Sequence, residues 1–102
     1  MGNNEIQKLQ FALGLAQKAG KIATGDFAVR DSFQNHKVRL LILAIDAASH
    51  SKENMHRLAE RSGVEVIENL TSAQIGSAIG KGKRICAAVL DANFTNLLQS
   101  KK

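Results

Sequence analysis

Residues 80–84, Gly-Lys-Gly-Lys-Arg, place three cationic side chains within four positions, with glycine between them. Lys81, Lys83 and Arg84 carry N–H donors suited to phosphate oxygens, and Gly80 and Gly82 let the backbone approach a ligand closely. Such a loop favours a phosphate-rich partner, such as a nucleic acid. Taken alone, it fits equally well a solvated surface that keeps the protein in solution.

A second stretch, residues 24–30, also combines a glycine, a helix end and cations. Thr24 is predicted to cap the helix that follows, and Asp26 in the first turn complements the helix dipole. The N–H groups of a helix N-terminus also suit phosphate. With Lys21 and Arg30 as flanking cations, we expect this stretch and residues 80–84 to meet at a single edge of the fold and form one positive surface.

Enzyme chemistry finds little support in the residue pattern. His50 and His56 are six positions apart, so they do not share a helix face as metal ligands at i and i+4 would. Cys86 lies within an apolar run, where a thiol is usually inert. Residues 76–83 superficially resemble a phosphate-binding P-loop, but the spacing fails and no Ser or Thr follows the lysine. We therefore expect no catalytic residue, no metal and no cofactor.

Composition fits one ordinary globular domain, residues 1–102. The chain is 44% hydrophobic and 23% charged, with a net charge of +5. No apolar stretch reaches the roughly 20 residues that span a bilayer, the N-terminus does not read as a signal peptide, and the single cysteine favours a reducing compartment. We expect a cytoplasmic protein, monomeric and without a membrane partner.

The aromatic residues are four phenylalanines, with no Trp or Tyr. This count argues against a protein that stacks successive bases of a single strand on an aromatic platform. It leaves recognition of a folded or double-helical nucleic acid, by phosphate and shape, as the better form of the hypothesis.

Helices and short apolar runs alternate along the chain. Apolar spacing predicts a helix over 4–19, and a second helix follows Thr24 and ends near 35–37, with Phe27 and Phe33 facing the core. Ser49 is predicted to cap a third helix that Gly63 ends, and the capping box at 71–74 opens a fourth that runs to Ile79. Asp91 or Asn93 caps a fifth. The predicted strands are 21–23, 39–45, 64–68 and 85–90.

This order predicts an α/β fold, a three-layer α/β/α sandwich around a mostly parallel four-stranded sheet with right-handed crossovers. Ligands of such sheets gather where loops from different units converge at one end of the strands.

Several stretches together resemble the L7Ae/L30e superfamily of ribosomal proteins. They are residues 17–21 (Gln-Lys-Ala-Gly-Lys), 24–29 (Thr-Gly-Asp-Phe-Ala-Val), 37–44, 46–49 (Asp-Ala-Ala-Ser) and 75–80 (Ile-Gly-Ser-Ala-Ile-Gly). The resemblance covers nearly the whole chain, and the small bacterial YlxQ-type members look most similar. It implies an α/β/α sandwich that binds RNA, often the sharply bent kink-turn.

The resemblance also implies an RNA surface at residues 25–31, 46–49 and 80–84, which adds Asp46 and Ser49 to the candidates. Kink-turn binders of the superfamily place Asn, Glu and Lys where this chain has Phe27, Ala28 and Asp31. Phenyl and methyl groups cannot make the hydrogen bonds that read base edges. The chain is therefore predicted to bind RNA through phosphates, without kink-turn specificity.

The leading hypothesis is a non-catalytic RNA-binding module that acts on structured RNA, ribosomal RNA included. Its candidate residues are Lys21, Thr24, Gly25, Asp26, Phe27, Arg30, Asp46, Ser49, Gly80, Lys81, Gly82, Lys83 and Arg84. The apolar replacement at 27–29 motivates an alternative, a protein–protein adaptor of the translation or transcription machinery that has kept the fold and lost the RNA surface.

Overall fold

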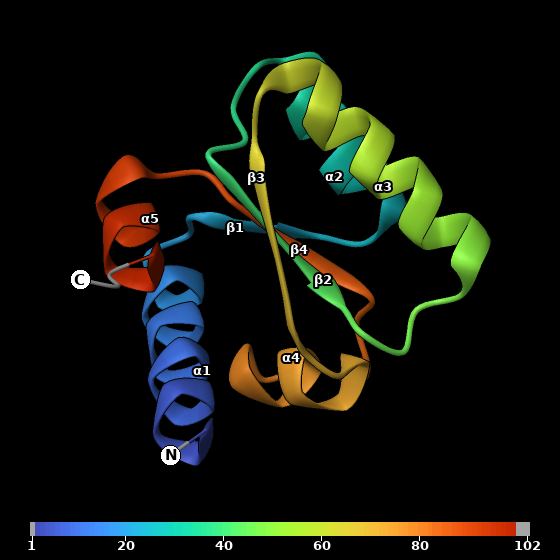
Figure 1. Cartoon of the computed structure of the whole chain (residues 1–102). Coiled ribbons are helices and arrows are strands. Elements are labelled where there is room, and N and C mark those ends of the chain that lie inside the picture. Colours follow the sequence, from blue (N-terminus) through green and yellow to red (C-terminus); the bar gives the residue numbers. More distant parts are fainter. Residues whose placement is uncertain (1, 100–102) are drawn as a thin grey trace.

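The structure, a computed structural model, describes residues 2–99, apart from the side chains of 2–4, 97 and 99. Helices and strands alternate along the whole of this range, as predicted (Figure 1). In chain order the elements are α1 (Gly2–Lys18), β1 (Ile22–Thr24), α2 (Asp26–Gln34), β2 (Leu40–Ala44), α3 (Ser49–Ser62), β3 (Glu65–Leu70), α4 (Ser72–Ala78), β4 (Cys86–Val89) and α5 (Ala92–Gln99). Among these described helices, none has the length and apolarity to cross a bilayer.

The sheet is mixed, so the prediction of a mostly parallel sheet was wrong. Its order is β1-β4-β2-β3; β2 pairs with β3 in parallel, and β4 runs antiparallel to both β1 and β2. The cause lies in the connection through α4. This helix has seven residues, a length of about 10 Å, and it packs near the end of the sheet where β3 finishes (Figure 1). The chain therefore re-enters the sheet at that end and β4 runs back.

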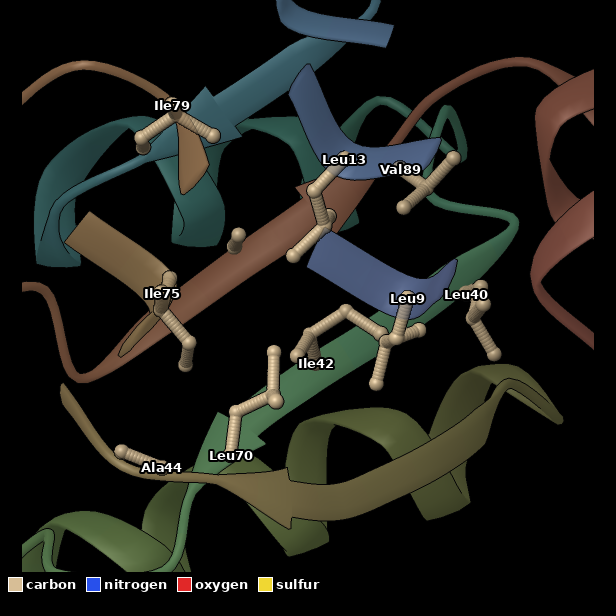
Figure 2. Packing of buried hydrophobic residues seen from close by; sticks show 10 residues of the cluster. Leu9, Leu13, Leu40, Ile42, Ala44, Leu70, Ile75, Ile79 and Val89 are labelled. Atoms are coloured by element: carbon tan, nitrogen blue, oxygen red, sulfur yellow. The ribbon is translucent and has the colours of Figure 1, made fainter. Parts of the chain in front are cut away.

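The predicted sandwich is confirmed by two apolar clusters, one on each face of the sheet. Side chains of β2 alternate: Leu40, Ile42 and Ala44 belong to the cluster that includes side chains of α1, α4 and α5. Figure 2 shows this cluster from close by, with Leu9 and Leu13 of α1 and Ile75 of α4 beside the strand. Leu41 and Leu43 point the other way, into the cluster with α2 and α3. All five residues of β2 are buried, because helices cover both faces.

Three helices begin or end at residues whose side chain or backbone conformation caps the helix. Thr71 and Gln74 form the predicted capping box, with both reciprocal hydrogen bonds present. Gly63 ends α3 in the left-handed conformation, with φ 67°. The Asp91 carboxylate accepts a hydrogen bond from the Asn93 N–H at 2.7 Å, so Asp91 is the cap of α5.

Candidate functional site

Four connections lie at one end of the sheet because β1, β2 and β3 end there and β4 begins there. We call this end the loop edge. It comprises residues 24–26, 45–49, 71–72 and 80–85. The loop edge thus contains ten of the thirteen candidate residues, and Phe27 and Arg30 follow within the first two turns of α2. Lys21 is the exception: its carbonyl accepts the Leu90 N–H at the opposite end of the sheet.

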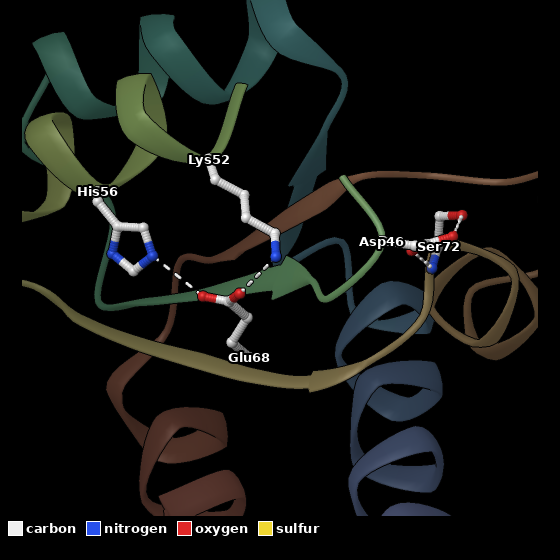
Figure 3. A network of polar contacts seen from close by, with 5 residues as sticks. All are labelled: Asp46, Lys52, His56, Glu68 and Ser72. Atoms are coloured by element: carbon white, nitrogen blue, oxygen red, sulfur yellow. Dashed lines mark hydrogen bonds and ion pairs between the residues drawn. The ribbon is translucent and has the colours of Figure 1, made fainter. Parts of the chain in front are cut away.

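Hydrogen bonds fasten the connections of the loop edge to one another. The Thr24 hydroxyl donates to the Cys86 carbonyl at 2.9 Å, which joins the end of β1 to the start of β4. The Asp46 carboxylate accepts from the Ser72 N–H at 2.7 Å and from its hydroxyl at 2.9 Å (Figure 3). The Arg84 N–H in turn donates to the Ser72 carbonyl at 3.1 Å. The loops therefore hold a fixed relative position.

The loop 80–84 rests directly on α4. Gly80 leaves the helix with φ 74°, in the left-handed region that favours glycine. The Lys81 N–H donates to the Gly76 carbonyl at 2.8 Å, and a Cβ on Gly76 would lie only 2.0 Å from the Gly82 carbonyl oxygen. Glycine at position 76 therefore allows the loop to pack closely on α4, and Lys81 and Lys83 remain exposed to solvent.

The start of α2 differs from the predicted cap. Gly25, not Thr24, occupies the cap position, with φ 95° and ψ 150°, and no side chain caps the helix. The Thr24 hydroxyl instead donates to the Cys86 carbonyl, which orients this side chain toward β4. Glycine is needed here because other residues rarely adopt this backbone conformation. Within the first turns, the Arg30 guanidinium pairs with the Asp26 carboxylate at 3.0 Å, and both side chains are exposed.

Two further sequence predictions at this edge were wrong. The cap position of α3 is Ala48, and Ser49 begins the helix without a capping hydrogen bond. Phe27 does not face the core: it is 84% exposed. The buried residues of α2 are Val29, Ser32 and Phe33. Helical geometry places Phe27 about 200° from Val29, on the side that faces water.

Burial and ion pairs determine the environments of Cys86, His56 and Glu68, side chains of types that can react or bind metals. Burial raises the pKa of the Cys86 thiol to about 11, so it remains protonated at neutral pH. His56 pairs with Glu68, whose other oxygen pairs with Lys52, both at 3.0 Å (Figure 3). These contacts lower the pKa of Glu68, the Lys52 bond first. In the part of the chain that the structure describes, no three His, Cys, Asp or Glu side chains lie close enough to hold a metal.

Comparison with known proteins decides the family. Residues 7–98 match the sequence model of the Ribosomal protein L7Ae/L30e/S12e/Gadd45 family. The chain belongs to this family. It is 32% identical over 88 residues to "RNA-binding protein YlxQ" of Bacillus subtilis (strain 168), covering 86% of this chain and 88% of that protein. The predicted resemblance, including the YlxQ-type members, is confirmed.

Other similar proteins support this family assignment. The YlxQ protein of Enterococcus faecium is 28% identical over 89 residues, 87% of this chain and 86% of the relative. "Large ribosomal subunit protein eL30" of Euphorbia esula is 27% identical over 96 residues, 92% and 86% of the two chains. A solved structure of "a protein with unknown function" from Bacillus halodurans C superposes with a TM-score of 0.85 at 34% identity, covering 89% of this chain and 92% of that one.

Sequence reasoning missed Ser72, which links the Asp46 loop to Arg84 in this L7Ae-family chain. The capping box did place Ser72 at the first position of a helix. Its partner could not be named, because that required knowing that β2 and β3 are neighbours in the sheet. Asp46 and Thr24, predicted to bind RNA, use their side chains within the protein. Their observed contacts position the loops.

We expect Asp46→Asn to lower the midpoint of thermal unfolding at neutral pH, and the difference from wild type to shrink in acid. The Ser72 N–H and hydroxyl lower the pKa of Asp46 below its usual value of 3.8. The unfolded chain therefore takes up the proton first, so the carboxylate's contribution is complete above pH 3.8 and is lost as pH falls through the folded-state pKa.

Melting curves followed by circular dichroism between pH 7 and pH 2.5 check this expectation. The control is Asp31→Asn, which changes an exposed aspartate on α2 outside the loop edge. If the midpoint of thermal unfolding of Asp46→Asn lies below that of wild type by the same amount at every pH, the charge of Asp46 does not hold the loop.

Proposed function

We propose that this chain is a non-catalytic RNA-binding protein that grips the phosphate backbone of structured RNA with the loop edge. One observation supports the proposal: residues 80–84 and the start of α2, the two segments that carry Lys81, Lys83, Arg84 and Arg30, lie at the same end of the sheet, where hydrogen bonds join the connections to one another. The printed name of the YlxQ relatives, "RNA-binding protein", supports it. Such a protein would act in the cytoplasm, with ribosomal RNA among its candidate partners.

Acidic groups at the loop edge are compatible with phosphate binding. The Asp46 carboxylate is occupied by two hydrogen bonds from Ser72. Asp26 pairs with Arg30 at the exposed surface, where an ion pair contributes only about 0–1 kcal/mol. A phosphate can therefore compete for the Arg30 guanidinium. Lys81 and Lys83 are both exposed. They can therefore contact a phosphate without breaking a buried interaction.

Recognition by phosphates alone would not distinguish a kink-turn from other helical RNA. Base-edge reading needs hydrogen-bonding side chains, and Phe27 and Ala28 have none at the start of α2. Gly25 would bring the backbone of that helix start close to the RNA, and the exposed Ser49 would face it from α3. We therefore propose binding by shape and charge, without kink-turn specificity.

Titration of a fluorescently labelled RNA hairpin of about 20 base pairs tests the proposal. Three or four phosphate contacts predict a slope of log K against log salt of roughly −3, hence an affinity loss of about 60-fold between 50 and 200 mM salt. Binding without salt dependence, or no binding at 50 mM salt, would contradict the proposal. The second result, in a folded protein, would favour the protein–protein adaptor.

A further inference from the structure

Helix α1 carries two large apolar side chains that the core does not bury. Phe11 is 69% exposed and Leu15 is 38% exposed, whereas Leu9 and Leu13 on the same helix belong to the core. Phe11 and Leu15 are four positions apart, so they are neighbours on the surface of the helix. Core packing therefore does not explain why these two positions are apolar.

A groove of about 390 Å³ lies beside this apolar pair, between α1 and the end of α4. Its α4 side is formed by residues 77–80. The two helices are in direct contact, as Figure 1 shows: the Gln10 side chain donates to the Gln74 carbonyl at 3.1 Å. A Cβ on Gly14 would lie only 3.0 Å from the Ala78 carbonyl oxygen, so the backbones approach closely here. The groove thus lies between two elements that hold each other in place.

Lysines stand at both ends of the apolar pair. Lys8 lies three positions before Phe11. Lys18 lies three positions after Leu15 and also lines the groove. At about 100° per residue, these four side chains fall within about 80° of arc on α1, and both lysines are exposed. The one carboxylate in the sequences of α1 and α4 is Glu5, about 120° around the helix from Phe11. The face is therefore apolar in the middle and cationic at each end.

We propose that this groove face, Lys8, Phe11, Leu15 and Lys18 with residues 77–80, docks an amphipathic helix of a partner protein whose apolar side chains are flanked by acidic ones. A helix that lays its apolar stripe into a groove is a common mode of protein recognition. Acidic side chains of the partner would meet the two lysines, which are about 15 Å apart along α1. The site is separate from the loop-edge cations, so this inference does not rest on RNA binding.

The charges argue against a second copy of this chain as the occupant. A two-fold interface brings the same face of both subunits together. Lysines would then face lysines, and like charges across an interface are costly. An RNA strand also matches this face less well than a helix does, because Leu15, between the two lysines, gives a base neither a ring to stack on nor a hydrogen bond.

A synthetic peptide supplies the chemistry of the partner. It has about 18 residues and is rich in alanine, with two leucines four positions apart and a glutamate three positions outside each leucine. The comparison peptide has lysine in place of both glutamates. In calorimetric titrations, wild type should bind the acidic peptide roughly 10-fold more tightly than the lysine peptide, because two exposed ion pairs are gained. The amide chemical shifts that change should be those of α1 and the end of α4.

Substitutions on two helices test the groove face itself. Phe11→Ala should weaken binding of the acidic peptide roughly 30-fold, as expected for loss of a central aromatic anchor. The matched control is Phe27→Ala, which removes an even more exposed ring from α2 and should leave this affinity unchanged. Lys8→Glu/Lys18→Glu should reverse the preference, so that the lysine peptide binds more tightly. All four residues are exposed, so none of these substitutions is expected to unfold the protein.

Titration with the RNA hairpin separates this inference from the proposed function. Phe11→Ala should bind the hairpin as wild type does, and Lys83→Ala/Arg84→Ala should bind the acidic peptide as wild type does. Failure of the acidic peptide to bind, or equal binding of both peptides, would overturn the inference and leave RNA binding unaffected. A dimer of wild type that Phe11→Ala dissociates would assign the face to a second copy, and loss of hairpin affinity in Phe11→Ala would assign it to RNA. Either result would also overturn the inference.

Discussion

Gly76→Ala is expected to destabilise the protein and displace the loop that carries Lys81, Lys83 and Arg84. The new Cβ would lie 2.0 Å from the Gly82 carbonyl oxygen, 2.6 Å from the Gly82 carbonyl carbon and 3.0 Å from the Lys81 carbonyl oxygen. All three atoms are backbone, so no side chain can rotate away. Overpacking of this kind costs about 1–3 kcal/mol in the free energy of unfolding, and relief requires the loop to move off α4.

RNA affinity should fall together with stability, because the cations of the loop would lose their fixed place at the loop edge. Urea unfolding and hairpin titration of the same preparation measure both effects. Gly82→Ala is the matched control: a Cβ there meets nothing within 4 Å, so stability should stay near the wild-type value. If Gly76→Ala has the stability and RNA affinity of wild type, the position of the loop does not depend on its close packing against α4.

The double substitution Lys83→Ala/Arg84→Ala should weaken RNA binding roughly 10- to 100-fold, since each residue would give up a charge-assisted contact to phosphate. The loss should be similar for unrelated hairpin sequences, because phosphates carry no sequence information. The slope of log K against log salt should become shallower by about 2, one phosphate contact for each cation.

Lys37→Ala/Arg39→Ala is the matched control for charge. It removes the same two units of positive charge from exposed residues at the opposite end of the sheet, where the Arg39 N–H donates to the Val89 carbonyl. This variant should keep nearly the wild-type affinity and slope. A larger loss here than in Lys83→Ala/Arg84→Ala would move the RNA surface to that end, where Lys21 also lies.

Local chemistry predicted most elements of the fold. The capping box at Thr71, the left-handed Gly63 and the buried run at 40–44 each depend on residues close in sequence. The strand directions could not be obtained in this way. Residues 71–85 are numerous enough for a parallel crossover, and only the packing of α4 near the end of β3 decides that β4 runs back.

In the candidate site, too, features set by nearby residues were predicted and features set by tertiary packing were not. The sequence predicted which loops carry the glycines and cations, and the family resemblance added the Asp46 loop. It misplaced Phe27 because apolar residues at 27–29 and 33 allow two overlapping helix faces, and packing selected the one with Val29. It assigned Thr24 to the helix cap because the competing acceptor, the Cys86 carbonyl, lies 62 positions away.

The place of β4 has a consequence for how the chain acquires its structure. β4 is the last strand in sequence but an inner strand of the sheet, where Val89 pairs with both Ile22 and Leu40. During synthesis from the N-terminus, β1 has no partner in the sheet until β4 has emerged from the ribosome. Contacts this distant in sequence slow folding, and a chain cut short before residue 86 would expose two unpaired strand edges to aggregation.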